Sequence, residues 1–191
     1  FNVYRSAYES GVKRVVLASS NHAADWYEHA LIHHRDMEML DPYRSPLSDN
    51  FYGWAKATYE HLGFLFASGT FGRKLEVVLV RIGAPREINL EDFPGDPGRY
   101  KRDLGAYISP RDLTQLFTRA IETPNIDNEH GIPWLIVYGI SDNTRSFWSL
   151  TSARQVLGYR PEDDSEIKYA RDIQSFLTGD EARGGTGRVG P

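Results

Sequence analysis

Tyr52 and Lys56 are the two residues whose types and spacing most clearly indicate chemistry. They lie four positions apart in residues 51–57, FYGWAKA, and on a helix side chains with that spacing share one face. An ammonium group beside a phenol favours the phenolate form, which allows a tyrosine to act as a general acid or base. The pair therefore predicts a proton-transfer site, whereas the alternative is a coincidental pair on a surface helix.

Two predicted strands and one predicted helix would position this pair. Residues 13–19 form a continuous, β-branched apolar run, and residues 75–82 form a second one; such runs are typical of buried parallel strands. The first strand is followed by SSNH at 19–22, where a parallel strand delivers polar groups to a site at its carboxyl end. The polar cluster at 48–50 can cap a helix that runs from Phe51 to Ser68.

The remaining pattern continues the alternation of helices and strands. An amphipathic helix is expected over the first eight residues, with Val3 and Tyr4 on its apolar face and Gly11 at its end. Ser109, Pro110 and Asp112 mark another helix start, and this helix is expected to bury residues 113, 116, 117, 120 and 121. A third strand is expected at 134–140, and a short helix at 151–157 ends at Gly158. Segments 21–50 and 84–105 are expected to be irregular loops.

Composition excludes several classes of protein. The 191 residues are 40% hydrophobic, and none of them is cysteine, which rules out a disulfide scaffold, thiol catalysis and thiolate metal sites. The formal net charge of −4 and the lack of a basic run argue against a nucleic-acid surface. No apolar stretch is long enough to span a bilayer. The expectation is a protein of the cytoplasm without bound metal.

Three motifs together resemble one enzyme family. LASSNH at 17–22, VRIG at 80–83 and VYGISDN at 137–143 are similar to segments of the extended short-chain dehydrogenase/reductases, the NAD-dependent epimerase/dehydratase family. The resemblance covers residues 1 to about 166. It is most specific for the branch that contains uronate dehydrogenases and archaeal NAD-dependent glucose-6-phosphate dehydrogenases.

The resemblance implies an α/β fold, namely the C-terminal part of a Rossmann-like, doubly wound parallel sheet with a small substrate-side region at 84–108. Residues 1–178 would belong to one NAD(P)-binding domain, and residues 179–191 would be a disordered tail. The glycine-rich dinucleotide loop of the family is not found in the sequence. We therefore expect a fragment of a longer protein; a half-protein that dimerises through its open sheet edge is the alternative.

The resemblance also assigns roles at the site. Tyr52 would transfer the proton, Lys56 would assist it and bind the cofactor ribose, and Ser20 would orient the reacting hydroxyl, although the adjacent Ser19 is an alternative. Ile82 and Gly83 would bring backbone close to the nicotinamide. Tyr52 and Lys56 are thus expected to be both catalytic and cofactor-binding, and Ser20 both catalytic and substrate-binding.

Further residues are implied to contact the substrate. Asn21 and His22 would bind substrate hydroxyls, and Arg102 would hold an anionic group, because a guanidinium fits a carboxylate or a phosphate bidentately. The alternatives are an ordinary polar histidine and a solvated charge in a basic patch. Arg81, at a strand end, is expected to form a structural ion pair. Residues 84–85 are Ala-Pro where uronate dehydrogenases carry serines, a departure that puts uronate itself in question.

Three functions are compatible with this pattern. The first is an NAD-dependent dehydrogenase, with NADP not excluded, that oxidises a sugar hydroxyl to a lactone. The second is a nucleotide-sugar epimerase or dehydratase with bound NAD, and the third is a non-catalytic cofactor-sensing protein on the same fold. A small sugar is the expected partner, with no nucleic acid and no membrane, and the full-length protein is expected to be a homodimer. The fragment alone is expected to be inactive.

Overall fold

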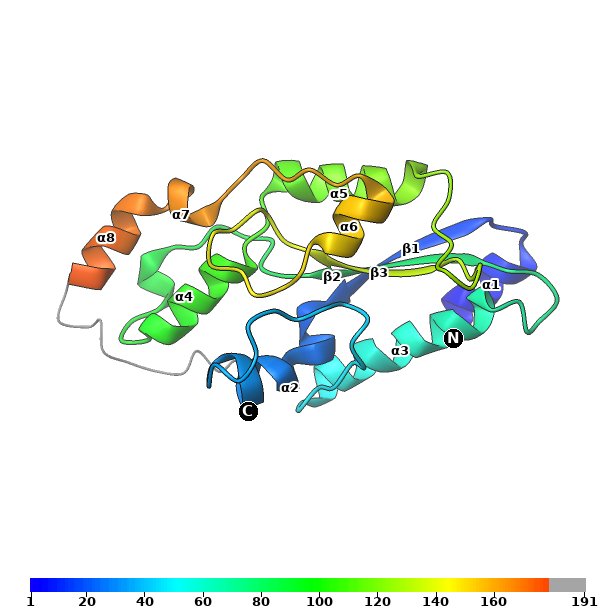
Figure 1. Cartoon of the computed structure of the whole chain (residues 1–191), viewed down its shortest axis with the longest axis horizontal. Coiled ribbons are helices and arrows are strands. Elements are labelled where there is room, and N and C mark those ends of the chain that lie inside the picture. Colours follow the sequence, from blue (N-terminus) through cyan, green and yellow to red (C-terminus); the bar gives the residue numbers. More distant parts are fainter. Residues whose placement is uncertain (179–191) are drawn as a thin grey trace.

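The computed structural model describes residues 1–178, and these form a three-stranded parallel sheet with helices on both faces (Figure 1). The strands are β1 (Arg14–Ser20), β2 (Glu76–Ile82) and β3 (Trp134–Gly139). The α-helices are α1 (Asn2–Glu9), α2 (Asp25–Tyr27), α3 (Phe51–Ala67), α4 (Pro97–Ala106), α5 (Pro110–Glu122), α6 (Thr151–Leu157), α7 (Ser165–Lys168) and α8 (Ala170–Thr178). Three short turns complete the set: η1 (Asn21–Ala24), η2 (Glu28–Ile32) and η3 (Leu90–Asp92).

The sheet has the order β1-β2-β3, and both strand pairs are parallel. Ser20 lies opposite Ile82, and Ile82 lies opposite Gly139, so the carboxyl ends of all three strands meet at one edge. The strands predicted from apolar runs are confirmed to within about one residue at each end, an offset expected of any boundary assignment. The α/β, Rossmann-like fold class is confirmed by these parallel strands and their helical crossovers.

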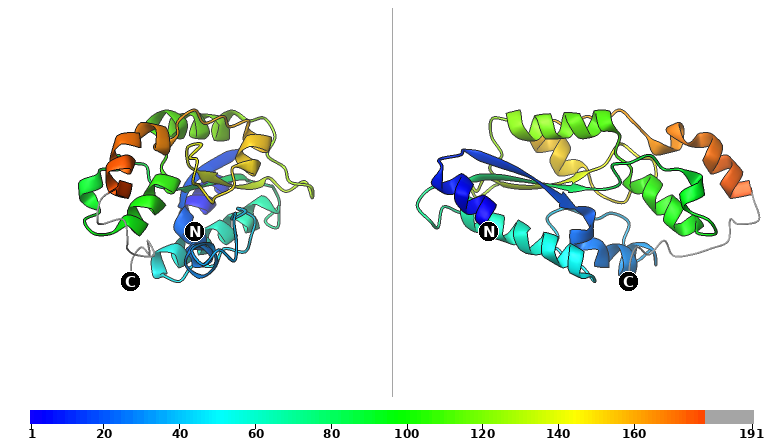
Figure 2. Two further views of the ribbon diagram at one scale, coloured as in Figure 1. Left: turned by 60° about the vertical axis from the view of Figure 1, so that its left-hand side comes forward. Right: turned by 180° about the vertical axis from the view of Figure 1, so that it is seen from behind.

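Each face of the sheet carries its own apolar core. Val77 and Leu79 of β2 pack with residues of α1 and α3, whereas Val78 and Val80 belong to a larger cluster with α5 and α6. This alternation follows from the two-residue period of a strand. Figure 2 shows the sheet between these two layers, with α4, α7 and α8 grouped beyond one end of it.

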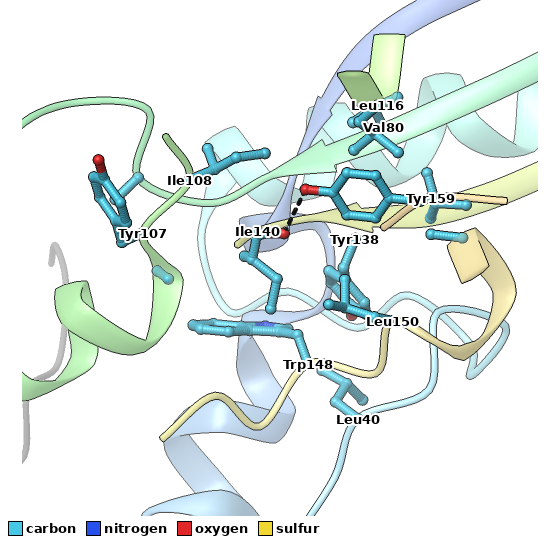
Figure 3. Close-up of a cluster of buried hydrophobic side chains, with 14 of the residues drawn as sticks. Leu40, Val80, Tyr107, Ile108, Leu116, Tyr138, Ile140, Trp148, Leu150 and Tyr159 are labelled. Carbon is cyan, nitrogen blue, oxygen red and sulfur yellow. Dashed lines mark hydrogen bonds between the residues drawn. The ribbon is translucent and has the colours of Figure 1, made fainter. Parts of the chain in front are cut away.

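The larger cluster extends from the sheet to the loops that follow β3. Figure 3 shows Trp148 next to Leu40 and Leu150, with Tyr138 from β3 and Ile140 directly after it. All five side chains are buried. The segment after β3 is therefore anchored by burial of large side chains.

One polar group that enters this core with a partner is the hydroxyl of Tyr159. The hydroxyl of Tyr159 donates a 2.9 Å hydrogen bond to the carbonyl oxygen of Ile140 (Figure 3). This hydrogen bond offsets the cost of burying the hydroxyl group.

Local sequence signals set the predicted helix boundaries. The Asn50 side chain caps α3 by accepting a hydrogen bond from the Gly53 amide at 2.9 Å, and Ser109 caps α5 through the Asp112 amide at 3.1 Å. Pro110 occupies the first turn of α5. Gly158 ends α6 with a φ of 66°, a left-handed conformation that favours glycine. These predictions are confirmed.

Other expectations were wrong. Segments 21–50 and 84–105 are irregular only in part, because they contain η1, α2, η2, η3 and most of α4. Helices α7 and α8 were not predicted. Asp96 caps α4 and Pro97 occupies its first turn, so a start signal was present but was masked by the surrounding proline and glycine. Val3 and Ile121, expected to be buried, are 63% and 62% exposed. The tail expected at 179–191 lies outside the described residues.

A buried ion pair joins α3 to all three strands. Arg81 of β2 donates to both carboxylate oxygens of Glu60 in α3, at 3.0 and 2.7 Å, and both side chains are fully buried. Ser19 of β1 donates to Glu60 at 2.5 Å, and Arg81 also donates to the Tyr138 hydroxyl of β3 at 3.2 Å. Burial lowers the pKa of Arg81, but Tyr138 and Glu60 outweigh it and raise that pKa. The structural ion pair expected for Arg81 is confirmed.

We predict that Glu60→Ala lowers the free energy of unfolding by about 3–5 kcal/mol, because it leaves the buried Arg81 guanidinium without its counter-ion. Urea unfolding followed by circular dichroism measures the change. Glu9→Ala, which removes half of the exposed Arg5–Glu9 pair, is the matched control and should have a much smaller effect. Equal losses in the two variants would contradict the prediction.

Candidate active site

The two serines at the end of β1 have different environments. The hydroxyl of Ser19 is engaged by Glu60 on the α3 side of the sheet. Ser20 instead caps η1, and its Oγ accepts the His22 amide at 3.2 Å and donates to Asn21 Oδ1 at 3.4 Å. Of the two serines that the sequence left open, Ser20 is the one placed among the other candidate site residues.

Helix α3 brings Lys56 and Tyr52 to the carboxyl end of β1. The Lys56 ammonium donates to the carbonyl oxygen of Ala18 at 3.1 Å, and it lies 5.5 Å from the centre of the Tyr52 ring. Tyr52 is 56% exposed, so its side chain remains accessible to a ligand. The helical four-residue spacing thus produces the juxtaposition that the sequence predicted.

Tyr59 is a second tyrosine beside the same lysine. The Lys56 ammonium lies 5.3 Å from its ring centre, but the Tyr59 hydroxyl donates to the Ala18 carbonyl at 2.6 Å. Burial raises the pKa of Tyr59 to about 12. A phenol that is already donating to backbone and resists ionisation is poorly suited to accept a proton, which leaves Tyr52 as the better candidate.

His22 lies directly against Tyr52. Their ring centres are 5.7 Å apart in an edge-to-face arrangement. His22 Nδ1 lies 3.0 Å from Asp25 Oδ2, and the Asn50 side chain donates to the same carboxylate oxygen at 2.6 Å. Neither Asp25 nor the hydrogen bond between Asn50 and Asp25 was identified from the sequence. The available signal was the three-residue spacing of His22 and Asp25, which fits a helical turn.

Asn21 is placed beside these residues in η1. It is 2% exposed, and its Nδ2 has no hydrogen-bond partner. A buried amide nitrogen without a partner is uncommon, and substrate contact by Asn21 and His22 remains a prediction.

Glycine allows α3 to approach η1 closely. A Cβ atom on Gly53 would lie 2.0 Å from the His22 carbonyl oxygen and 2.1 Å from Ser48 Oγ. Because the first of these contacts is with backbone, no side-chain rotation could relieve it. Gly53 therefore lets the first turn of α3, which carries Tyr52, lie against His22.

Gly83 serves a similar packing role at the end of β2. A Cβ there would lie 2.1 Å from the Ala106 carbonyl oxygen, and the Gly83 amide donates to the Gly139 carbonyl at 3.0 Å. Ile82, the last residue of β2, is partly buried. The cofactor contacts expected for Ile82 and Gly83 remain predictions.

Arg102 lies in α4 and forms a buried ion pair. Its Nε donates to Glu28 Oε1 at 2.8 Å and its Nη2 to Glu28 Oε2 at 3.2 Å, and its guanidinium carbon lies 5.4 Å from the Trp148 ring centre. Arg102 is only 7% exposed, so the alternative of a solvated charge is wrong. The expected grip on an anionic substrate group remains a prediction, and such an anion would have to compete with Glu28.

Residues 1–178 contain neither a cluster of metal-ligating side chains nor a membrane-spanning helix. This part of the chain contains no group of three or more histidine, cysteine, aspartate or glutamate side chains that could hold a metal ion. None of its helices combines the length and apolarity needed to cross a bilayer. The site consists of a hydroxyl, a phenol, an ammonium and a carboxylate-bound imidazole, a set suited to hydrogen bonding and proton transfer.

The close contact at Gly53 predicts that an alanine at this position destabilises the protein, the opposite of the usual effect in a helix. Replacing glycine by alanine inside a helix normally stabilises it by up to about 1 kcal/mol. We predict that Gly53→Ala instead lowers the free energy of unfolding by about 1–3 kcal/mol, because the new methyl group collides with backbone. Urea unfolding checks this, with Thr58→Ala on the exposed face of α3 as control. A stabilised Gly53→Ala protein would refute the close approach.

The Glu28–Arg102 pair predicts a pH dependence of stability. Burial raises the pKa of Glu28, but Arg102, helped by His33, outweighs burial and lowers this pKa from 4.5 to about 2. The unfolded state therefore binds more protons between these values, so the pair's stabilisation is complete above pH 4.5 and is lost as the pH falls toward 2.

We expect Glu28→Gln to remove up to about 1.4 kcal/mol per pH unit from the slope of unfolding free energy against pH in this acid range. Denaturant unfolding at a series of pH values measures the slope. Glu38→Gln, at an exposed position, is the control. Parallel curves for the wild type and Glu28→Gln would show that the carboxylate is not held ionised.

Two curated relatives are similar over most of the chain. The uronate dehydrogenase of Pseudomonas syringae is 33% identical over 183 residues, which cover 95% of this chain and 57% of the relative. The NAD-dependent glucose-6-phosphate dehydrogenase of Haloferax volcanii is 36% identical over 171 residues, with 85% and 58% covered. No family model matches. The chain spans about half the length of these curated relatives.

Solved structures agree with this relationship. The crystal structure of uronate dehydrogenase from Agrobacterium tumefaciens superposes with a TM-score of 0.68 at 28% identity, covering 91% of this chain and 55% of that one. Similarity in both sequence and backbone, each over about half of the relative's length, confirms the resemblance found in the motifs. The chain is therefore a homologue of uronate dehydrogenases and of an NAD-dependent glucose-6-phosphate dehydrogenase, and it has the Rossmann-like fold of the short-chain dehydrogenase/reductases.

Proposed function

We propose that the full-length protein is an NAD-dependent dehydrogenase that oxidises a hydroxyl group of a small sugar, sugar acid or sugar phosphate to a lactone. The observation that carries this proposal is the placement of Tyr52 and Lys56 at the carboxyl end of β1, where Lys56 is bound to the Ala18 carbonyl and Ser20 ends the strand. The named activities of the homologues support the same reaction class. Residues 1–178 would supply the C-terminal part of the NAD(P)-binding domain.

The residues at this edge fit a nicotinamide cofactor. Tyr52 is more than half exposed and the Lys56 ammonium lies beside its ring, so a phenol and an ammonium are available together to bind ribose hydroxyls. When bound, NAD would supply the hydride acceptor. NADP is not distinguished from NAD by the described residues, because the acidic or basic group that discriminates them follows the second strand of such folds.

Each residue of the chain would then have a separate task. Ser20 would hold the reacting hydroxyl group of the sugar by a hydrogen bond. Tyr52 would accept the proton of this hydroxyl as a hydride leaves the carbon atom that bears it. Lys56, whose ammonium lies 5.5 Å from the centre of the Tyr52 ring, would assist this transfer and bind the cofactor ribose. The buried Glu60–Arg81 pair would keep α3, and with it both residues, in place.

The proposal has three further parts. A small sugar would be the substrate, the full-length protein would be a homodimer, and its location would be the cytoplasm. The anionic group of a uronate or a sugar phosphate would be held by Arg102, provided that it displaces one of the Glu28 hydrogen bonds.

We predict that Tyr52→Phe reduces kcat by a factor of about 10²–10⁴, the range typical of losing a general acid or base. Lys56→Met should produce a loss of the same order. The measurement is the reduction of NAD by the full-length protein, followed by the absorbance of the reduced nicotinamide. The sugars tested are glucuronate, galacturonate and glucose 6-phosphate. Product analysis for a lactone accompanies it.

Tyr43→Phe is the matched control because Tyr43 is also an exposed tyrosine, 47% accessible, and lies outside the site. It should retain full activity. Full activity of Tyr52→Phe would refute the assigned role. Interconversion of sugar epimers without net NAD reduction would favour an epimerase, and a protein that binds NAD but converts no sugar would favour a cofactor sensor.

A further inference from the structure

A continuous chain of hydrogen bonds links the end of β1 to the start of α3 through a buried carboxylate. Asp25 Oδ2 lies 3.0 Å from His22 Nδ1 and accepts the Asn50 amide nitrogen at 2.6 Å. The other side-chain atom of Asn50, Oδ1, accepts the Gly53 amide and caps α3. One asparagine therefore connects the carboxylate to the helix that carries Tyr52.

The carboxylate is costly to keep in this position. Asp25 is 1% exposed, its Oδ1 has no hydrogen-bond partner, and neither an arginine nor a lysine forms an ion pair with it among the described residues. A buried carboxylate with incomplete hydrogen bonding lowers the stability of the fold. Its presence here therefore suggests a role other than stabilisation. Its two hydrogen-bond partners are His22, a candidate site residue, and Asn50, which caps the helix of Tyr52; these partners indicate what that role is.

A carboxylate at Nδ1 fixes the state of an imidazole ring. A carboxylate can only accept, so His22 Nδ1 must carry the proton, and in the neutral ring Nε2 is then the acceptor. The ring orientation is fixed at the same time, and its edge-to-face contact with Tyr52 at 5.7 Å follows from it. An acceptor at Nε2 is suited to a hydroxyl donor on a sugar.

We propose that Asp25 is a positioning residue for substrate binding: it holds His22 in the Nδ1–H tautomer and, through Asn50, aligns that ring with the first turn of α3. His22 then accepts a hydrogen bond from a second hydroxyl of the sugar while Tyr52 acts on the reacting one. This role of Asp25 rests on the proposed sugar dehydrogenase function, but the tautomer itself does not.

The tautomer is tested without any activity measurement. Long-range ¹H–¹⁵N correlation spectra of the histidine rings distinguish Nδ1–H from Nε2–H in the neutral form, and His22→Gln identifies the signals of His22 among the six histidines. The wild type should show Nδ1–H at His22, and Asp25→Asn should shift the ring toward Nε2–H. The control is Asp49→Asn, which alters the other histidine–aspartate pair, His29–Asp49, and should leave His22 unchanged.

Asn50→Ser provides a second variant in case Asp25→Asn does not fold. Serine is as good a helix cap as asparagine, but it is too short to replace the amide contact with Asp25. We expect α3 to remain folded and the His22 ring signals to broaden or move. An Nε2–H tautomer at His22 in the wild type, or unchanged His22 signals in a folded Asp25→Asn protein, would overturn the proposal.

Kinetics of the full-length protein separate positioning from a structural role. Asp25→Asn should raise KM for the sugar about tenfold with a smaller change in kcat and none in KM for NAD. The double variant with His22→Gln should be no worse than His22→Gln alone, because Asp25 acts through His22. Additive losses would overturn the positioning role. Absence of any sugar oxidation by the wild type would refute the proposed function, while the spectra would still decide the tautomer.

Discussion

The arrangement of the site depends on one buried ion pair. Glu60 and Arg81 are fully enclosed, and such a pair is tolerated only if the remaining hydrogen-bonding positions are filled. Ser19 and Tyr138, which are the cross-strand neighbours of Arg81, and the carbonyl oxygen of Pro42 occupy such positions. Since Glu60 belongs to α3, the pair fixes both the depth and the rotation of this helix. Tyr52 and Lys56 lie eight and four residues before Glu60, on the same side of the helix, so the pair also sets where these two side chains lie.

The start of α3 is fixed by a second set of contacts at the carboxyl edge of the sheet. Gly53 permits contact with the His22 backbone, and Asn50 joins the helix cap to Asp25. The short helical segments η1, α2 and η2 give regular structure to the first part of the connection between β1 and α3. A site built from two elements distant in sequence is thereby held by backbone packing and hydrogen bonds, which suits reactions that require preorganised groups.

The substrate side is organised by a different principle. Arg102 and Glu28 connect α4 to η2, and Trp148 from the segment after β3 covers the guanidinium. Three separate stretches of chain therefore meet around one ion pair. A substrate anion at Arg102 would have to replace the Glu28 carboxylate. Glu28 would therefore compete with a uronate or phosphate group for the guanidinium.

The sequence by itself determined the strands, the caps at Asn50 and Ser109, and the face shared by Tyr52 and Lys56, because runs, caps and helical spacing are local properties. It did not reveal α4, whose start signal lies among prolines and glycines, nor the four-residue α7 and the α8 that follows it. Tertiary structure alone separated Ser19 from Ser20, paired Arg102 with Glu28 and brought Asn50 to Asp25. Those choices depend on burial and on contacts between distant segments, which no local pattern encodes.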